Sequence, residues 1–302
     1  MRIGVLGAGG VGGYYAGALA RAGHTVRLIA RGAHLDAIRK QGGLEIRTPT
    51  ERYTADVGAT DDLAALVGTD AVIVAVKSYS LAEIAPGLRA AAESGAAVLP
   101  LLNGVDMADR MAALGIPRGS VIGGATYIIA ARTAPGVIER TSAFARVVLG
   151  EFDGQPSDRS TRLAAALRDA GAEVTLTDTI AVELWRKFFF IAAMAAACGL
   201  ARRPIGPLRE TPYGRLLLER AAAEVIAVAR ASGIPIRDDE AERIARAFDG
   251  LDATAKPSFL LDLERGPGSP TELDLFSGTV ARLGRAAGVT TPVHDTAIGA
   301  LG

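Results

Sequence analysis

The chain opens with Met1-Arg2-Ile3-Gly4-Val5-Leu6-Gly7-Ala8-Gly9-Gly10-Val11-Gly12-Gly13, and this stretch decides the fold. An apolar strand over 3–6 runs into glycines at GxGxxG spacing, and a helical pattern follows over 14–21. In such a turn Gly7 permits the bend, Gly9 lets the backbone approach a pyrophosphate, and Gly12 lets helix and strand pack closely. The helix N-terminus presents N–H groups and a positive dipole end to the phosphates. The stretch therefore predicts a dinucleotide-binding unit.

The residues that follow bear on whether a nucleotide binds and on which one. Gly23-His24-Thr25 leads into a second apolar strand over 26–30, which disfavours the alternative of a glycine turn without a nucleotide. NAD-binding domains normally place Asp or Glu at the end of this strand, whereas this chain has Ala30-Arg31-Gly32. The planar fork of Arg31 can pair with a 2′-phosphate, so NADP(H) is the expected cofactor. A solvated loop arginine is the alternative.

Strands and helices alternate up to residue 177, and helical periodicity takes over from residue 178. Further strands are predicted at 44–47, 52–56, 71–76, 97–102, 121–129, 136–140, 146–149 and 173–177, with helices at 34–40, 63–67, 81–93, up to 114, and 158–170. Later helices are predicted at 179–198, 213–232, 238–248, 257–264 and 272–287, with Asp178 as N-cap of the first. The expected fold is α/β: a Rossmann-type doubly wound sheet over 1–177, with antiparallel additions after Ser120, and an all-helical substrate domain over 178–302.

Composition narrows the class of partner. The 33 basic and 33 acidic residues cancel, which disfavours nucleic acid and membrane as partners and points to a local site for a small molecule. The single cysteine, Cys198, excludes an internal disulfide, is expected in the core, and fits a cytoplasmic protein. No signal peptide is recognised, and the apolar run over 188–200 is shorter than a ~20-residue membrane span, so a buried helix is expected. No metal site is expected, and a homodimer stays open.

Four polar residues are candidates for chemistry. Lys77 and Asn103 follow successive apolar strands, at the sheet edge where a nicotinamide ribose would lie, although each alone could be an ordinary strand-end residue. Lys187 lies where a predicted helix becomes wholly apolar, and a partly desolvated ammonium suits proton donation to a carbonyl oxygen as hydride arrives at carbon. Snorkelling to solvent is the alternative for Lys187. Glu272 is expected to begin a helix, where dipole compensation is its simpler role.

These motifs together resemble the ketopantoate reductase (2-dehydropantoate 2-reductase) family over essentially the whole chain. The matching positions, in the family's order, are Gly7-Ala8-Gly9-Gly10-Val11-Gly12, Arg31, Lys77, Leu102-Asn103-Gly104, Glu183-Leu184-Trp185-Arg186-Lys187, 258–262 and Thr271-Glu272-Leu273-Asp274. The resemblance implies an NADP-dependent oxidoreductase of pantothenate biosynthesis. It implies that Lys187 is the general acid, that Glu272 and Ser258 contact substrate, and that Asn103 and Lys77 line the nicotinamide and substrate side.

Two departures from the family put the substrate in doubt. The family's better-known members carry asparagines four and eight residues after the catalytic lysine, where this chain has Ile191 and Ala195. The run between Asp262 and Glu272 also looks about two residues longer than usual, which weakens the register of Ser258. The leading expectation is NADPH-dependent reduction of ketopantoate. The alternatives are reduction of a more apolar 2-oxo acid or ketone, and a non-catalytic NADP-binding redox sensor.

Overall fold

The computed structural model describes all 302 residues, which form two compact units. The N-terminal unit comprises Met1–Leu102 and Asp106–Ile180, and the C-terminal unit comprises Asn103–Val105 and Ala181–Gly302. The short segment Asn103–Val105 therefore packs with the second unit although it follows a strand of the first.

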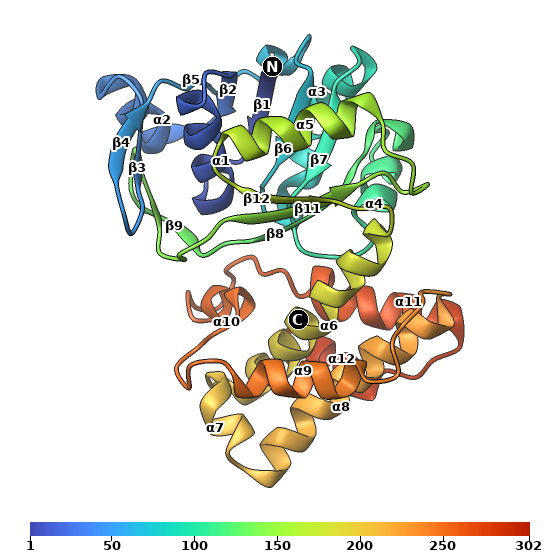
Figure 1. Ribbon diagram of the computed structural model, residues 1–302. Helices are drawn as coiled ribbons and strands as arrows, with labels where there is room; N and C mark the ends of the chain where they lie inside the picture. The colour runs from blue at the N-terminus through green and yellow to red at the C-terminus, as the bar shows by residue number, and fades with distance from the viewer. The chain divides into compact units, whose positions relative to one another are not determined.

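A five-stranded parallel sheet forms the centre of the N-terminal unit (Figure 1). Its strands, in the order β5-β2-β1-β6-β7, are β5 (Gly58–Thr60), β2 (Thr25–Ile29), β1 (Arg2–Leu6), β6 (Ala71–Val74) and β7 (Ala97–Pro100). The inner strands are runs of buried apolar residues, as expected for a sheet covered on both faces. The chain reverses its direction of winding between β1 and β6, and in such sheets ligands bind beside this switch point.

Two smaller sheets complete the N-terminal unit. One has the order β4-β3-β10-β9, built from β4 (Arg52–Ala55), β3 (Leu44–Arg47), β10 (Val137–Arg140) and β9 (Ala130–Ala134). It packs on α1 (Gly10–Arg21), where added Cβ atoms at Gly13 and Gly17 would lie 2.7 and 2.5 Å from Ile138 and Ile46. The other has the order β12-β11-β8, built from β12 (Glu173–Leu176), β11 (Arg146–Gly150) and β8 (Gly123–Tyr127). The pairs β9–β10 and β8–β11 are antiparallel, as expected after Ser120.

The remaining helices of this unit are α2 (Gly32–Lys40), α3 (Leu81–Glu93), α4 (Met107–Ala113) and α5 (Asp158–Asp169). Short 3₁₀ turns cover Leu63–Leu66, Ser78–Ser80 and Arg118–Ser120, so the helix expected over 63–67 is a single 3₁₀ turn. The strands expected over 71–76, 97–102 and 121–129 are shorter than expected, because only their central residues pair with neighbours. Strands β5 and β9 were not expected. β5 has only three residues, and β9 is largely exposed, so neither forms a run of buried apolar residues in the sequence.

The C-terminal unit is entirely helical (Figure 1). Its helices are α6 (Ile180–Ala201), α7 (Ile205–Arg209), α8 (Pro212–Ala231), α9 (Glu240–Asp249), α10 (Ser258–Leu263), a π-helical turn (Asp274–Gly278), α11 (Thr279–Ala287) and α12 (Pro292–Leu301). Helix α6 is long and apolar enough to cross a membrane by length and composition, but 67% of its most apolar window is buried in the structure. Cys198 is buried on it, as expected.

Three expectations for this unit were wrong. Helices α7 and α12 were not expected, because Pro207 and Pro292 lie within or at the start of short apolar stretches that give little periodicity. Asp178 is not the N-cap of α6, which begins at Ile180, one residue too late for that role. The helix expected over 272–287 begins instead with the π-helical turn, and Glu272 precedes it.

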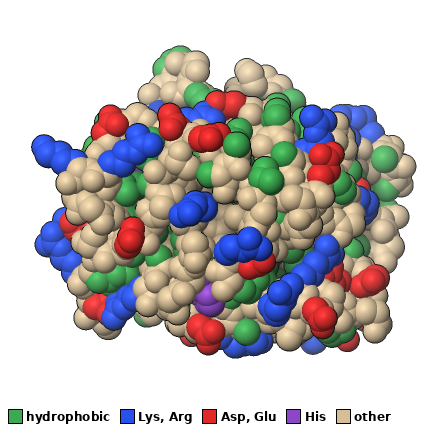
Figure 2. Space-filling model, turned by 90° about the horizontal axis from the view of Figure 1, so that it is seen from above, with side chains coloured by type: hydrophobic (Ala, Val, Ile, Leu, Met, Phe, Trp, Pro, Cys, Tyr) green, Lys and Arg blue, Asp and Glu red, His purple; other side chains and the backbone are tan.

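Charges of both signs are interspersed on the face of the molecule shown in Figure 2, without a large patch of either sign. This distribution agrees with the equal numbers of basic and acidic residues in the chain. A specific anionic ligand therefore needs a local set of donors rather than a general positive field.

Candidate active site

The glycine turn between β1 and α1 is shaped by close backbone contacts. Gly7 has φ +102°, and a Cβ added there would lie 2.6 Å from the carbonyl oxygen of Ala75, just beyond β6. A Cβ added at Gly12 would lie 2.0 Å from the oxygen of Gly7, and one added at Gly10 would lie 2.0 Å from the oxygen of Ala130. Real Cβ contacts are not this short, so only glycine fits these three positions. The turn thus lies at the switch point and is tightly held there.

Gly9 differs from its neighbours, because a Cβ added there would meet nothing within 4 Å. The chain itself therefore does not require glycine at this position. Gly9 is also the N-cap of α1, and the first turn of that helix carries no acidic residue. The N-terminal amides of a helix lack partners within the helix and attract anions. Open space beside these amides is what a pyrophosphate needs, so the turn fits a dinucleotide.

Arg31 lies at the N-cap position of α2, two residues after the end of β2. Its guanidinium pairs with the carboxylate of Glu83 on α3, and both side chains are exposed. An exposed ion pair contributes about 0–1 kcal/mol, so a phosphate dianion could replace Glu83 as the partner. The position fits recognition of a 2′-phosphate.

Lys77 and Asn103 occupy equivalent positions after neighbouring strands. Val74 of β6 pairs with Pro100 of β7, and each candidate follows the end of its strand by three residues. The expected strand ends at 76 and 102 were wrong, so both residues lie in loops rather than at strand ends. Both are half-buried. Lys77 belongs to the N-terminal unit and Asn103 to the C-terminal unit.

Lys187 is the ionisable group with the most altered environment among the predicted site residues. It lies in the first half of α6, half-buried beside the core residues Trp185 and Phe188. Burial lowers the pKa of Lys187 to about 8. An amine with this pKa is still mostly protonated at neutral pH, yet it gives up its proton far more readily than an exposed lysine.

Ile191 and Ala195 lie one and two turns after Lys187, on the same face of α6. Ile191 is half-buried and Ala195 is buried. The face of the helix that carries the lysine is therefore apolar over its next two turns. A polar substrate group placed there would find no side-chain partner on this face of α6.

Glu272 and Ser258 come from the segment after α9. Glu272 is 4% exposed, and its backbone carbonyl accepts a hydrogen bond from Phe276 in the π-helical turn. Ser258 is exposed and is the first residue of α10. The rings of Phe259 and Phe276 lie 6.2 Å apart, and both belong to the core cluster that includes Phe188 of α6. The segments that carry Lys187, Ser258 and Glu272 thus share one core.

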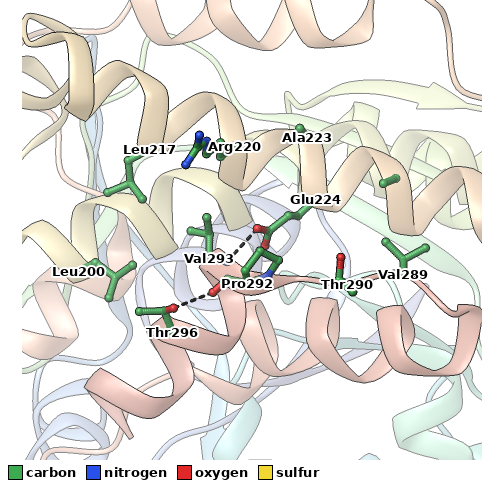
Figure 3. A pocket seen from close by; sticks show the side chains of 11 residues that line it. Leu200, Leu217, Arg220, Ala223, Glu224, Val289, Thr290, Pro292, Val293 and Thr296 are labelled. Atoms are coloured by element: carbon green, nitrogen blue, oxygen red, sulfur yellow. Dashed lines mark hydrogen bonds between the residues drawn. The ribbon is translucent and has the colours of Figure 1, made fainter.

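A pocket of about 620 Å³ lies elsewhere in the C-terminal unit, along α8 and the start of α12 (Figure 3). Its lining is mostly apolar, with Arg220 and Glu224 as its charged residues. Glu224 accepts hydrogen bonds from the backbone amides of Val293 and His294, at 2.8 and 3.1 Å, and so caps α12. None of the predicted site residues lines this pocket. Glu224 thus has a structural role, and we do not place the candidate active site in this pocket.

Ala130 is the contact of the glycine turn that the sequence did not reveal. Its carbonyl oxygen lies close to Gly10, although Ala130 begins β9, more than a hundred residues later in the chain. The π-helical turn after Glu272 was also missed, and such turns are often found at functional sites. Neither has a pattern in the sequence that could have indicated it.

Comparison with known proteins places the chain in one family. The family models for ketopantoate reductase PanE/ApbA and for its C-terminal domain match residues 3–154 and 179–302. The 2-dehydropantoate 2-reductase of Halobacterium salinarum is 34% identical, and the uncharacterized oxidoreductase YkpB of Bacillus subtilis is 31% identical. Both alignments cover 98% of this chain and 96% of the relative. A solved PanE/ApbA family ketopantoate reductase from Ralstonia eutropha JMP134 superposes with a TM-score of 0.88 at 31% identity, covering 98% of this chain and 96% of that one. The chain belongs to the ketopantoate reductase family of oxidoreductases.

Proposed function

We propose that this protein reduces a 2-oxo acid to a 2-hydroxy acid with NADPH, and that 2-dehydropantoate (ketopantoate) is the first substrate to test. The observation that carries the proposal is Lys187, a half-buried amine at the start of the apolar part of α6, whose pKa burial lowers to about 8. A structural lysine needs no such environment, whereas a general acid for a carbonyl oxygen benefits from it. The named activity of the Halobacterium relative supports the choice of substrate.

The residues of the N-terminal unit fit the cofactor. The open space at Gly9 and the helix N-terminus at Gly10 would hold the pyrophosphate, and Arg31 would hold the 2′-phosphate. The backbone of Ala8 and Val11 would complete the cradle. Lys77, together with Asn103 of the C-terminal unit, would lie on the nicotinamide side. When bound, NADPH supplies the hydride for the carbonyl carbon.

The residues of the C-terminal unit would perform the proton chemistry. The Lys187 ammonium would stabilise the negative charge that develops on the substrate oxygen, and it would then give its proton to that oxygen. Glu272, with its carboxylate in a buried segment, would hydrogen-bond the substrate and orient the lysine. Ser258 would contribute a hydroxyl contact to the substrate.

A second candidate keeps this reaction and changes the substrate. Ile191 and Ala195 leave the face of α6 beyond Lys187 without a polar partner. A substrate hydroxyl placed there would give up water without gaining a hydrogen bond, a loss of about 1–3 kcal/mol. This favours a 2-oxo acid or ketone that is more apolar than ketopantoate. A redox sensor without catalysis is the weakest candidate, because a sensor needs neither Lys187 nor Glu272.

A panel assay tests class and substrate together. The purified protein is mixed with NADPH, or with NADH, and with ketopantoate, its analogue without the hydroxyl, or other 2-oxo acids and ketones, and loss of reduced cofactor is followed by absorbance. Turnover of any 2-oxo acid supports the proposal, and the order of kcat/KM values identifies the substrate. Binding of NADPH without turnover of any compound would favour the sensor. Location in the cytoplasm, a role in pantothenate biosynthesis and assembly as a homodimer stay predictions.

A further inference from the structure

His294 is a buried histidine of the C-terminal unit that the proposed reaction does not use. It lies in the first turn of α12 and has no exposed surface. Its Nε2 lies 3.2 Å from the backbone oxygen of Ala221 on α8, and its Nδ1 lies 3.1 Å from the hydroxyl oxygen of Ser277. A carbonyl oxygen can only accept, so the ring carries its proton on Nε2, and Nδ1 accepts from Ser277. Burial lowers the pKa of His294 to about 4, which agrees with a neutral ring.

Helix α8 holds the backbone of His294 as well as its ring. The carboxylate of Glu224 on α8 accepts hydrogen bonds from the amides of Val293 and His294, at 2.8 and 3.1 Å. The ring donates to the same helix at Ala221. Because α8 fixes both ends of the residue, Nδ1 of His294 occupies a fixed place, and the hydroxyl of Ser277 must meet it there.

Ser277 belongs to the π-helical turn that follows Glu272. The amide of Gly278 donates to the carbonyl of Leu273, five residues earlier, at 3.0 Å, and the amide of Phe276 donates to the carbonyl of Glu272 at 3.1 Å. Ser277 is 1% exposed, so its hydroxyl needs a partner inside the protein, and the ring on α12 supplies it. This hydrogen bond therefore ties the π-helical turn to the first turn of α12.

The geometry of the π-helical turn decides where Glu272 lies. An α-helical turn holds about 3.6 residues and a π-helical turn holds more, so a shift of one residue would rotate the segment before the turn by about 100° relative to the segment after it. Helix α11 begins at Thr279, directly after the turn, and its residues Val280 and Ala281 have no exposed surface. Because the core fixes α11, the displaced residue would be Glu272, which precedes the turn.

We propose that His294 is a positioning residue for the proposed reaction, which holds the π-helical turn through Ser277 and so fixes the place of Glu272. This role deepens the proposed function and rests on it in one respect, because it takes Glu272 to contact the substrate. The hydrogen bonds that connect α8, His294, Ser277 and Glu272 all lie within the C-terminal unit. The residues expected to hold the pyrophosphate and the 2′-phosphate belong to the N-terminal unit. Loss of the His294–Ser277 bond should therefore affect reaction with substrate and spare the binding of NADPH.

Variants of His294 separate the two hydrogen bonds of the ring. In His294→Gln the amide nitrogen lies near the position of Nε2 and can still donate to Ala221, but no acceptor reaches Ser277. In His294→Asn the side-chain oxygen lies near the position of Nδ1 and can still accept from Ser277, but the bond to Ala221 is lost. Ser277→Ala removes the bond to Nδ1 from its other side. Glu224→Gln is the matched control, because it weakens the attachment of α12 to α8 and leaves both partners of the His294–Ser277 bond in the chain.

The measurements are kcat/KM for the substrate found in the panel assay, the Kd of NADPH and the melting temperature of each variant. We expect His294→Gln and Ser277→Ala to lower kcat/KM about tenfold, as for one lost hydrogen bond, with the Kd of NADPH within about twofold of the parent value. We expect His294→Asn and Glu224→Gln to keep kcat/KM within about threefold even where their melting temperatures fall. Activity should thus follow the bond to Ser277 and not the stability of the variant.

A second comparison shows whether the effect passes through Glu272. In a Glu272→Ala protein, assayed at high protein concentration, Ser277→Ala should change the remaining kcat/KM by less than about twofold, because no carboxylate is left to be misplaced. A purely structural role of His294 and Ser277 would lower kcat/KM by the same factor with and without Glu272.

Three results would overturn the positioning role alone: unchanged kcat/KM in His294→Gln and Ser277→Ala, equal losses in His294→Asn and His294→Gln, or equal effects of Ser277→Ala with and without Glu272. The proposed function survives each of them, because the unaltered protein still reduces its substrate. If Glu272→Ala keeps full kcat/KM, or if the unaltered protein reduces no 2-oxo acid, the proposed function is wrong at that point, and the role of His294 fails with it.

Discussion

The glycines of the turn should respond to alanine in opposite ways, and the reason lies in their surroundings. At Gly12 an added Cβ would lie 2.0 Å from the oxygen of Gly7, more than 1 Å closer than an ordinary contact. At Gly9 an added Cβ would meet nothing within 4 Å. Gly12→Ala therefore should affect the folding of the chain, whereas Gly9→Ala should affect what the chain binds.

The magnitudes can be worked out for both variants. Alanine within a helix normally stabilises by about 0.5–1 kcal/mol relative to glycine, whereas forcing a methyl group into a packed contact costs about 1–3 kcal/mol or more. Because the nearest atom at Gly12 is a backbone oxygen, relaxation is costly, so we expect a net loss of about 1–2 kcal/mol or more in the free energy of unfolding. Gly9→Ala replaces an N-cap glycine, which costs about 0.5–1 kcal/mol. Its methyl group would fill the space beside the pyrophosphate, and we expect the Kd of NADPH to rise at least tenfold, about 1.4 kcal/mol.

Urea unfolding and NADPH titration of the same two preparations test this reasoning. The expected outcome is a Gly9→Ala protein that is nearly as stable as the parent and binds NADPH poorly, beside a Gly12→Ala protein that is clearly less stable. A Gly9→Ala protein with unchanged affinity for NADPH would refute the placement of the cofactor at this turn. A Gly12→Ala protein of unchanged stability would refute the steric argument.

Three further predictions concern the proposed reaction. Lys187→Met should lower kcat by about 10²–10⁴-fold with the Kd of NADPH retained, and kcat of the unaltered protein should fall as the pH rises through about 8, where the amine loses its proton. The pKa of Lys187 is lower in the folded state, about 8, than in the unfolded state, 10.5, so the charged lysine destabilises the folded state. This destabilisation is complete below pH 8 and disappears as the pH rises above 10.5. Lys187→Met should therefore raise the free energy of unfolding at pH 7 by up to about 3 kcal/mol. Arg31→Asp should weaken NADPH by about 1.5–3 kcal/mol more than NADH, whereas Glu83→Gln, which removes only the ion-pair partner of Arg31, should leave the affinity for NADPH unchanged or improved. Ile191→Asn combined with Ala195→Asn should move the preference in kcat/KM toward ketopantoate and away from its analogue without the hydroxyl.

Each of these has an outcome that contradicts it. Near-normal turnover by Lys187→Met would exclude the lysine as general acid. Equal losses for both cofactors in Arg31→Asp would remove the argument for NADPH. A micromolar KM for ketopantoate in the unaltered protein, with strong rejection of the analogue, would show that another group already binds the hydroxyl.

The sequence alone was enough to identify the fold class, the glycine turn and the division between alternating and purely helical patterns. The reason is that these features depend on local signals: the spacing of glycines, runs of buried apolar residues and helical periodicity. The same local signals placed β1, α1, β3 and α3 within a few residues of their observed bounds. They also identified Lys187 as unusual, because a lysine at the start of an apolar helical run stands out without any structure.

Only the tertiary structure decided features that depend on distant contacts. The contact of Ala130 with Gly10, and the contact of His34 with Gly136, join residues about a hundred positions apart, and no local pattern encodes them. The second sheet arises in the same way, because β3 and β10 pair across the sequence. The lowered pKa of Lys187 likewise reflects the surroundings that folding assembles. Local sequence determines where the helices and strands form, and their packing determines which side chains and backbone groups come into contact.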